Sequence, residues 1–586
     1  MEFSQLFLLR KAICILAIAG VAGCTSFAGG QESTTTAAGD YTAGAIIDDA
    51  ETASLINWNS SQYLLSINSK QQVVLNNIGR STEHTILSSV EDDGAVKRLY
   101  PSGVVDGEKL HAVWMEKNTK PKATKEKTGD KFIIHAALLT GKNEEPKLQR
   151  ISNGGGAFVP IIKTSKDGKI FVVWVDERRG GAFDIYVNAS RDGGKNWLPE
   201  EFHLTNDVHP FVIDPTIEIV GNSVVVAWVQ QKSKNVFSVL SRTSNDFGSS
   251  WSSPSIVYED SNQPITPKLL HTKEGLNACW AMATGVACAG SKDNGYSWDK
   301  WSLIEGSERT GLLSIKSDSK GLIHVITNQR SEDGKSAALF YSNGSAFQGF
   351  LRVRPISREP LFNTKSIAPS FAVGPRDELM VAWMDFHFMK PLIAATASND
   401  GGKTWLKPYI VSYFGKTDHQ YFPYITIDSE NVFDLVYLSE GVGKNDWTTI
   451  QGAVDVPRNT YDPKIDVSSL KYRALQYWET RLKSDWSKSY DFMDPYYRKV
   501  VKKETYVATQ GRVNYFSYEI KGEPQLNGVK ASIPIEYESE VPEFMIKGKM
   551  VKVPKQKTVY QQNWVWMDGQ WYVVFEDVMG NTSLPN

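Results

Sequence analysis

Two cysteines, Cys279 and Cys288, have the residue type and spacing for covalent chemistry in the folded part of the chain. They flank Ala283-Thr284, which can form the turn of a hairpin in which residue 279 faces residue 288. In that register the two residues form a non-hydrogen-bonded pair with Cα atoms about 4.5 Å apart, within disulfide range. The spacing predicts a cross-strand disulfide, and two buried thiols are the alternative. No cluster of His or Cys accompanies them, which disfavours a metal or catalytic role.

Four octapeptides each place one carboxylate at a fixed position in the pattern Ser-x-Asp-x-Gly-x-x-Trp. Each aspartate can accept backbone N–H bonds across a turn, and the glycine supplies a backbone conformation that other residues avoid. Because each turn offers a single carboxylate, metal ligation is the less favoured use. We expect each tryptophan to pack against its own hairpin. The residues are Asp192 and Trp197, Asp246 and Trp251, Asp293 and Trp298, and Asp400 and Trp405.

A second pattern shows which elements carry these turns. A proline is followed 13 or 14 residues later by an aromatic that closes a β-branched run, which reads as strand, short polar turn, strand. Six copies keep this spacing: Pro101 to Trp114, Pro160 to Trp174, Pro215 to Trp228, Pro267 to Trp280, Pro369 to Trp383 and Pro423 to Tyr437. A seventh copy, residues 312–326, has lost both markers.

Together the two hairpins make a unit of about 54 residues with four strands. Repetition of this unit predicts a mainly β protein, a β-propeller of six to seven four-stranded blades, with seven favoured. Six blades result if residues 422–456 only complete a ring with strands from residues 55–75.

The octapeptide resembles the Asp box of the bacterial neuraminidase repeat, which is found in sialidases and related propellers. The resemblance covers roughly residues 95–455. It implies that the Asp boxes lie opposite the active-site face, where the loops after the aromatic strands and the starts of the first strands line a central mouth. A solvated rim is the alternative for these charged positions. The candidate mouth residues are Arg98, Glu116, Asp176, Glu177, Arg178, Arg330, Asp385, His387, Tyr421 and Glu440.

The catalytic markers of sialidases are incomplete in this chain. Sialidases resemble one another in an Arg-Ile-Pro motif, a three-arginine clamp, a Tyr and Glu nucleophile pair and an Asp acid/base. No copy here has arginine two residues before the proline, and Pro101 follows Arg98-Leu-Tyr. Since a one-residue slip turns a side chain to the other face of a strand, Arg98 replaces the marker only if the strand bulges. Candidate nucleophiles are Tyr421 and Tyr424, and candidate acids are Asp176 and Asp385.

The N-terminus is typical of an exported protein. Arg10-Lys11 precede an apolar run at 12–22 that is too short to cross a bilayer, which takes about 20 residues. The run ends in Val21-Ala22-Gly23-Cys24, which resembles the bacterial lipobox and implies cleavage before Cys24 and its lipid modification; an ordinary signal with a chance cysteine is the alternative. Thr25 then implies the outer membrane or cell surface. We expect a lipoprotein signal peptide at 1–23 and a flexible tether at 24–50.

A different fold is expected after the propeller at 51–457 and a linker at 458–467. Apolar residues at helical spacing predict a helix over 470–482, a shorter helical segment starts at Asp485, and alternating strands follow. Asp568-Gly569 predicts a two-residue hairpin turn. The pattern over 468–586 resembles the nuclear-transport-factor-two-like, cystatin-like cone, which implies an α+β domain with a curved antiparallel sheet that holds a ligand, a partner or another copy. We expect Trp564, Trp566 and Trp571 to pack in the core.

Composition narrows the function. The 586 residues carry 64 Lys plus Arg against 66 Asp plus Glu, a net charge of −2, so no basic field attracts nucleic acid. We expect no metal and no cofactor. The favoured hypothesis is a lipid-anchored, sialidase-like propeller that binds carbohydrate or an envelope protein. The alternatives are an exo-acting sialidase-type glycoside hydrolase and an envelope assembly scaffold.

Overall fold

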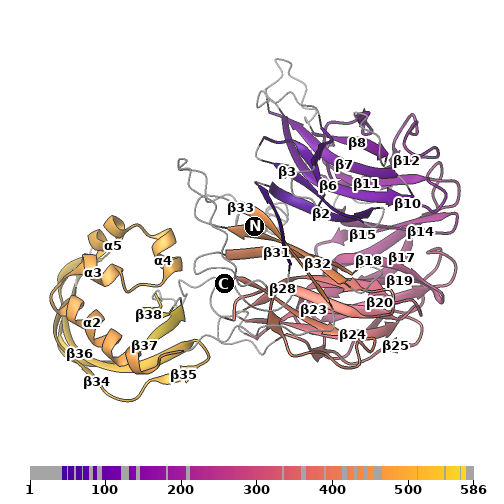
Figure 1. Cartoon of the computed structure of the whole chain (residues 1–586). Helices are drawn as coiled ribbons and strands as arrows, with labels where there is room; N and C mark the ends of the chain where they lie inside the picture. The colour runs from indigo at the N-terminus through magenta and orange to yellow at the C-terminus, as the bar shows by residue number, and fades with distance from the viewer. Residues whose placement is uncertain are drawn as a thin grey trace.

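The structure is a computed structural model that describes residues between 42 and 575 (Figure 1). Residues 1–41, 576–586 and a number of loops lie outside the described residues, the longest of these loops being 120–130, 454–464, 89–95, 412–418 and 358–364. Cys24, the predicted signal peptide and most of the predicted tether and linker therefore lie outside them. None of the described helices is both long and apolar enough to span a bilayer.

Eight antiparallel sheets follow one another along residues 42–453. Sheet 1 has β2 (Ala50–Trp58), β3 (Ser61–Asn68), β4 (Val73–Asn77) and β5 (His84–Ile86). Sheet 2 has β6 (Val96–Asp106), β7 (Lys109–Asn118), β8 (Lys131–Leu139) and β9 (Gln149–Arg150). Sheet 3 has β10 (Ala157–Thr164), β11 (Ile170–Asp176), β12 (Asp184–Ser190) and β13 (Phe202–His203). Sheet 4 has β14 (Val212–Val220), β15 (Ser223–Ser233), β16 (Val236–Ser244) and β17 (Ser255–Asp260).

The remaining sheets repeat this plan. Sheet 5 has β18 (Ile265–Thr272), β19 (Gly275–Met282), β20 (Gly285–Ser291) and β21 (Ser302–Leu303). Sheet 6 has β22 (Thr310–Ser317), β23 (Ile323–Arg330), β24 (Ala337–Ser345), β25 (Gly349–Phe350) and β26 (Arg354–Pro355). Sheet 7 has β27 (Ser366–Val373), β28 (Leu379–Asp385), β29 (Leu392–Ser398) and β30 (Tyr409–Ile410). Sheet 8 has β31 (His419–Ile427), β32 (Val432–Glu440), β33 (Asn445–Ala453) and, beside β33, β1 (Thr42–Asp48).

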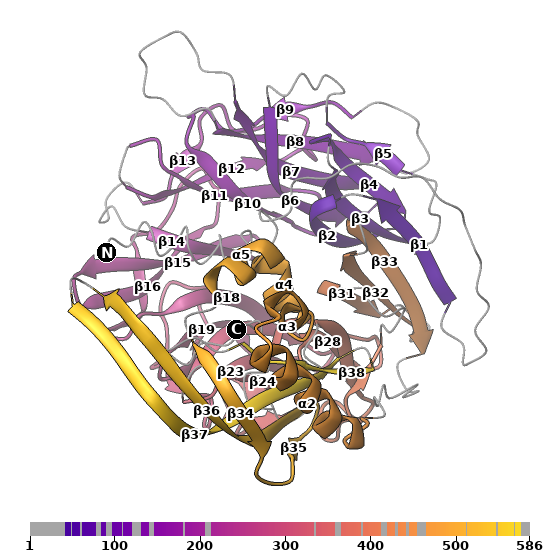
Figure 2. The ribbon, with the colours of Figure 1, turned by 90° about the vertical axis from the view of Figure 1, so that its left-hand side faces the viewer.

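The eight sheets form a closed ring. The first strand of each sheet contacts the first strand of the next, from β2 through β6, β10, β14, β18, β22 and β27 to β31, and β31 contacts β2. Figure 2 shows the sheets succeeding one another around this ring. Tryptophans of the second strands, Trp114, Trp174, Trp228, Trp280 and Trp383, are fully buried. The mainly β propeller predicted from the repeats is therefore the observed architecture.

The predicted number of six to seven blades is wrong for the described residues, which form eight sheets. Residues 50–86 make a sheet of their own instead of completing the last one, and they lack the proline and octapeptide markers. β1 pairs with β33, so the two ends of the repeat close the ring together. The predicted tether at 24–50 is too long, because residues 42–48 form β1 and belong to the propeller.

Each of the six copies marked by proline has a β-bulge in its first strand. The residue before the proline has a left-handed backbone, with φ between 46° and 56°, at Tyr100, Val159, Asp214, Thr266, Ala368 and Phe422. In β6 the register shifts between Leu99 and Ser102, and the other five strands shift at the equivalent place. A bulge re-aims the side chains around it. The prolines thus mark where each first strand bends.

The hairpin of β19 and β20 has the register that the sequence predicts. Met282 pairs with Gly285 around the two-residue turn, and Cys279 lies directly opposite Cys288. The two cysteines form a disulfide with Cα atoms 4.1 Å apart. Both are buried, so the bond cross-links the middle of sheet 5.

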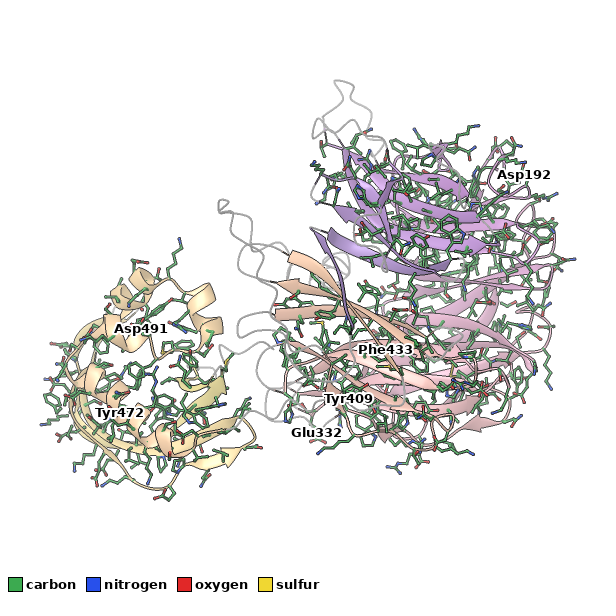
Figure 3. The ribbon with its side chains drawn as sticks, viewed as in Figure 1. Asp192, Glu332, Tyr409, Phe433, Tyr472 and Asp491 are labelled. Carbon is green, nitrogen blue, oxygen red and sulfur yellow. A yellow bond between two sulfur atoms is a disulfide. The ribbon has the colours of Figure 1, made fainter. Side chains whose placement is uncertain are left out.

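The four octapeptides form the same turn. Asp192 Oδ1 accepts the backbone N–H of Asn196 at 2.9 Å, and the serine at the start of the turn, Ser190, accepts that of Gly194 at 2.9 Å. The other three turns repeat both bonds. The hydrogen bonds that Asp192 accepts from the backbone and side chain of Asn196 lower the pKa of Asp192 to about 2. Asp192 lies at the outer rim of the propeller, whereas Phe433 is buried inside it (Figure 3).

The turn tryptophans also contact the preceding sheet, which the sequence did not predict. Trp251 keeps a contact within its own turn as well, since its Nε1 donates to the Gly248 backbone oxygen at 3.2 Å. Trp197 Nε1 donates to Gln149 Oε1 of sheet 2 at 2.9 Å, and Trp298 Nε1 donates to Ser241 Oγ of sheet 4 at 2.9 Å. The Trp405 ring meets the Tyr341 ring of sheet 6 edge-on at 4.9 Å. The octapeptides therefore join neighbouring blades.

Replacing Gly402 with alanine should disrupt one of these joints. Gly402 has φ of +83°, and a Cβ there would lie 1.9 Å from the Tyr341 hydroxyl, which is held by His324 Nδ1 at 2.7 Å. Gly401 is the matched control, because it has φ of +69° and nothing within 4 Å of its Cβ position. We expect Gly401→Ala to cost about 1–2 kcal/mol for its backbone alone and Gly402→Ala clearly more. Equal denaturation midpoints for the two variants would contradict the close approach.

The C-terminal part contains four helices and a separate sheet in residues 468–573. The helices are α2 (Ser468–Leu482), α3 (Trp486–Tyr490), α4 (Pro495–Val500) and α5 (Lys503–Thr509). The strands are β34 (Asn514–Ile520), β35 (Gln525–Asn527), β36 (Lys530–Ile546), β37 (Lys549–Met567) and β38 (Gln570–Val573), in the antiparallel order β34-β36-β37-β38 with β35 beside β36.

The helix α2 and the final hairpin agree with the sequence pattern. Met567 pairs with Gln570 across Asp568-Gly569, and Gly569 has φ of +83°. Trp564, Trp566 and Trp571 are all buried, as expected of core residues. The helices α4 and α5 were not predicted, because the sequence after Asp494-Pro495 was interpreted as strands. Asp494 caps α4 by accepting the backbone N–H of Tyr497, with proline in the first turn.

Candidate functional site

The predicted mouth residues lie where the second strand of a sheet ends beside the start of the first. Asp176 pairs with Ala157 in sheet 3, Asp385 pairs with Ser366 in sheet 7, and Glu116 pairs with Arg98 in sheet 2. The sequence therefore placed these residues at the correct ends of the strands. Their side-chain contacts decide whether they can act on a substrate.

Three of the candidate carboxylates accept a hydrogen bond from the tryptophan two residues before them. Trp114 Nε1 donates to Glu116 at 3.1 Å, Trp174 Nε1 to Asp176 at 3.2 Å and Trp383 Nε1 to Asp385 at 2.8 Å. Asp176 and Asp385 also accept the backbone N–H of the residue two positions later, at 2.9 Å and 2.7 Å. Both aspartates are buried. These carboxylates hold the ends of the central strands together.

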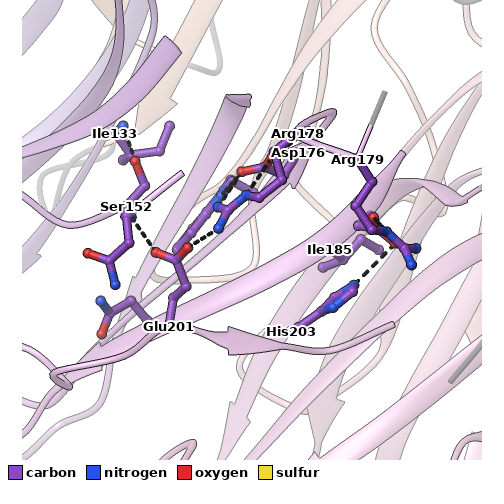
Figure 4. A network of polar contacts seen from close by, with 12 residues as sticks. Ile133, Ser152, Asp176, Arg178, Arg179, Ile185, Glu201 and His203 are labelled. Carbon is purple, nitrogen blue, oxygen red and sulfur yellow. Dashed lines mark hydrogen bonds and ion pairs between the residues drawn. The ribbon is translucent and has the colours of Figure 1, made fainter. Parts of the chain in front are cut away.

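Asp176 is further occupied by Arg178 (Figure 4). Arg178 Nε donates to Asp176 Oδ1 at 2.9 Å and its Nη2 to Oδ2 at 2.6 Å, and the same guanidinium contacts Glu201. It also lies 4.0 Å from the centre of the Tyr186 ring. Although burial opposes the charge, the two carboxylates raise the pKa of Arg178 above its usual range. An acid held in this way is poorly placed to donate a proton to a substrate.

A second charged network lies beside it and was missed by the sequence interpretation. Arg179 contacts both oxygens of buried Asp184, His203 Nε2 lies 3.2 Å from Asp184 Oδ1, and Thr205 donates to it at 3.3 Å. Burial opposes ionisation of Asp184, yet His203 and Arg179 keep its pKa below the usual value. The feature of the sequence that could have indicated this network is the Arg-Arg pair at 178–179. Arg178 binds Asp176 and Arg179 binds Asp184.

Arg98 lies in a strand with a bulge, which is the condition under which it could replace the missing arginine of the sialidase motif. Its side chain is nevertheless not available to a ligand. Its side chain is 2% exposed. Its Nε donates to Glu116 Oε1 at 2.7 Å and its Nη1 to the backbone oxygen of Gln71 at 2.7 Å. Arg98 precedes the bulge, so the bulge does not turn it outwards. It joins sheet 2 to sheet 1.

The remaining candidates have separate surroundings. Glu177 contacts Lys131, and His387 lies just after Asp385. Tyr421 packs against the apolar clusters of sheets 7 and 8, with its ring 6.1 Å from that of Phe422. Glu440 ends β32, and its side chain lies outside the described residues.

Arg330 is exposed at the end of β23, and its backbone oxygen accepts Arg309 Nε at 3.1 Å. Arg98 and Arg178 each serve carboxylates of their own sheet, whereas Arg309 and Arg330 belong to sheet 6. Among the described contacts these four arginines share no partner. The structure therefore gives no support to a three-arginine clamp made from them.

The first strands carry a different set of charged residues, which we call the axial lysines: Lys163 of β10, Lys268 of β18 and Lys316 of β22. These strands lie along the inner ring, with only β14 between β10 and β18. Lys268 and Lys316 are exposed, and neither forms an ion pair with another described residue. Lys163 pairs loosely with Glu218 of β14, at 3.4 Å.

The surrounding protein favours the neutral form of Lys268 and Lys316, as the lowered pKa of each shows, although solvent reaches both side chains. Burial lowers the pKa of Lys268, and the positive charge of Lys163 lowers it further, while Asp214 opposes the shift. Burial also lowers the pKa of Lys316. Nearby, burial and the charge of Arg330 lower the pKa of Lys365 at the start of sheet 7. Positive charge therefore accumulates on the inner ring at sheets 5 to 7. A bound anion would stabilise the protonated form of these lysines.

The sequence interpretation missed the axial lysines because it followed the loops after the aromatic strands. A signal was present, since Lys268 comes directly after Pro267 and thus directly after a bulge. Within the part of the chain that the structure describes, there is no group of three or more His, Cys, Asp or Glu arranged to hold a metal ion.

Comparison with known proteins adds distant structural similarity. A protein of unknown function from Dyadobacter fermentans is 13% identical, with 61% of this chain and 95% of that chain covered and a TM-score of 0.37. The polysaccharide lyase Uly1 is 10% identical, with 60% of this chain and 90% of that chain covered and a TM-score of 0.38. The Hadza microbial sialidase Hz136 is 15% identical, with 64% of this chain and 81% of that chain covered and a TM-score of 0.31.

An α-L-arabinofuranosidase from Fusarium graminearum is 13% identical over 62% of this chain and 94% of that chain, with a TM-score of 0.33. No family model matches the chain, and no curated protein matches it. All these TM-scores are below 0.5, so the similarity is distant. The propeller fold is established by the closed ring of eight sheets among the described residues.

Proposed function

We propose that this protein is an exported binding protein, anchored through a lipid on Cys24, that holds an acidic carbohydrate on the axial lysines without hydrolysing it. One contrast carries the proposal. The candidate acids Glu116, Asp176 and Asp385 are bound to tryptophan indoles, arginine or backbone N–H groups, whereas Lys268 and Lys316 are exposed and have no ion pair with a described residue.

The chemistry of the inner ring favours an anion with several carboxylates. Ammonium groups on neighbouring first strands can each meet a separate carboxylate of an extended chain. Asp214 and Glu218 leave an excess of positive charge when the three axial lysines are protonated. A neutral sugar would leave that charge uncompensated.

The test is a calorimetric titration of the soluble chain without its signal segment with oligogalacturonate. We expect the double variant Lys268→Gln/Lys316→Gln to bind at least tenfold more weakly than the wild type. The matched control is Lys232→Gln/Lys488→Gln, which removes the same charge from exposed surface ion pairs elsewhere. Equal weakening by both double variants would show a general charge effect and contradict the axial site.

Turnover assays distinguish the alternatives. A sialidase-type hydrolase would release a chromophore from an aryl sialoside and would lose activity in Tyr421→Phe. An assembly scaffold would retain its envelope partners in the axial double variant. The proposal expects no turnover and no effect of Tyr421→Phe on binding.

A further inference from the structure

A second charged site lies in the C-terminal part, where Arg481 of α2 forms no ion pair with a carboxylate that the structure describes. Its guanidinium donates to the Tyr477 hydroxyl at 3.0 Å and to the Tyr515 hydroxyl at 2.7 Å. Its Cζ also lies 5.6, 5.2 and 4.9 Å from the ring centres of Tyr477, Trp486 and Tyr515. No described carboxylate lies within 4 Å of it. Among the described residues, the positive charge is surrounded by phenol hydroxyls and aromatic rings and by no carboxylate.

The neighbouring acids are all engaged elsewhere. Glu479 pairs with Lys483 at 2.8 Å, Asp485 with Lys488 at 3.0 Å and Asp491 with Lys503 at 3.0 Å. Burial raises the pKa of Tyr477 to about 12 and raises that of Tyr506, so these phenols are neutral near pH 7. Hydroxyl groups therefore satisfy some N–H donors of Arg481 without balancing its charge.

Solvent reaches this cluster. Arg481, Trp486 and Tyr515 are partly exposed, whereas Tyr477 and Tyr506 behind them are buried. Arg481 Nη1 and Nη2 each carry two N–H groups, and the bonds to Tyr477 and Tyr515 use one of each, while Tyr506 also bonds the guanidinium. A guanidinium that is held in place by hydroxyls and rings is prepared for a planar anion. The partly exposed rings of Trp486 and Tyr515 offer apolar contact to the rest of such a molecule.

We propose that Arg481, Tyr515 and Trp486 form a binding site for a small organic carboxylate. The carboxylate accepts two hydrogen bonds from the guanidinium, and the organic part packs on the exposed edges of the two rings. This site is independent of the axial lysines, since it lies in the part of the chain after residue 468.

The experiment compares benzoate with benzamide, which has nearly the same shape but no charge, by calorimetric titration of the same soluble chain without its signal segment. We expect benzoate to bind at least tenfold more tightly than benzamide. Equal affinities, or no binding of benzoate at millimolar concentration, would overturn the proposal.

Variants locate the site. Arg481→Gln should reduce benzoate affinity at least tenfold, and Arg481→Lys should have an intermediate effect because a lysine keeps the charge but loses the two-pronged geometry. Lys483→Gln is the control, since it removes a positive charge from the same helix end in an exposed ion pair. Unchanged binding in Arg481→Lys and Arg481→Gln, or equal loss in Lys483→Gln, would overturn the assignment. Oligogalacturonate binding at the axial lysines should be unaffected in all three.

Discussion

Glu116→Ala is expected to destabilise the propeller by about 3–5 kcal/mol, because it removes the carboxylate that accepts the Nε–H of the buried Arg98 guanidinium. The Arg98 side chain is 2% exposed and gives its Nε–H to Glu116 at 2.7 Å. The substitution also removes the acceptor of the Trp114 indole, which is fully buried. Both losses affect the contact between sheets 1 and 2. Chemical denaturation followed by tryptophan fluorescence measures the change.

Two controls separate the buried charge from a general effect of losing a glutamate. Glu177→Ala removes an acid whose ion pair with Lys131 is partly exposed, and it should cost about 0–1 kcal/mol. Arg98→Met/Glu116→Ala should recover part of the loss, because it removes the buried positive charge together with the acid that it contacts and keeps apolar volume. A single variant Glu116→Ala as stable as the wild type would contradict a structural role for this pair.

Acid should destabilise the propeller from about pH 6.5 downwards because of His111 and His135. The two imidazoles are buried, and His111 Nδ1 lies 3.2 Å from His135 Nε2. Burial, with the charge of Lys109, lowers the pKa of His111 to about 4. Burial, with the charge of His111, lowers the pKa of His135 to about 3, although Gln149 opposes the shift.

The sign follows from the two states. The unfolded chain takes up protons as the pH falls through about 6.5, while the folded chain keeps both histidines neutral, so the folded state loses stability. At about 1.4 kcal/mol per pH unit, each histidine costs roughly 3 kcal/mol between pH 6.5 and pH 4. The carboxylates of the octapeptide turns act in a lower window, since those of Asp192 and Asp400 have pKa values of about 2.

Unfolding midpoints measured between pH 7 and pH 4.5 test this expectation. The wild type should lose stability steeply over this range, and His111→Gln/His135→Gln should show a much flatter dependence. His84→Gln is the control, because His84 is exposed. Equal slopes for the wild type and the double variant would contradict the assignment to the buried pair.

The repeat of proline, aromatic and octapeptide predicted most of the propeller because those residues have local structural duties. The prolines occupy bulges, the tryptophans fill the spaces between sheets, and the Ser, Asp and Gly of each octapeptide close one turn. The sequence predicted strands within residues 55–75 but not a separate sheet 1 or the strand β1, because residues 42–86 carry none of these markers. Their place depends on contacts with β33 and β6, which are distant in sequence.

The candidate mouth was harder to predict because the same residue types serve binding and construction. Asp176 and Arg178 lie at the expected end of sheet 3, but there they neutralise each other through two hydrogen bonds, which the sequence pattern does not show. Lys268 and Lys316 lie on strands that the sequence predicted, yet nothing in the pattern shows which lysines lack an acid. That information comes from pairing across sheets.

Titration with oligogalacturonate and its fully methyl-esterified form tests the central claim most directly. The two oligosaccharides share a backbone and differ in charge, so the axial lysines should distinguish them. We predict that the acid form binds at least tenfold more tightly, that Lys268→Gln/Lys316→Gln removes this preference, and that neither form is cleaved. Equal binding of both forms, or cleavage of the acid form, would contradict an axial site that binds an acidic carbohydrate without hydrolysing it.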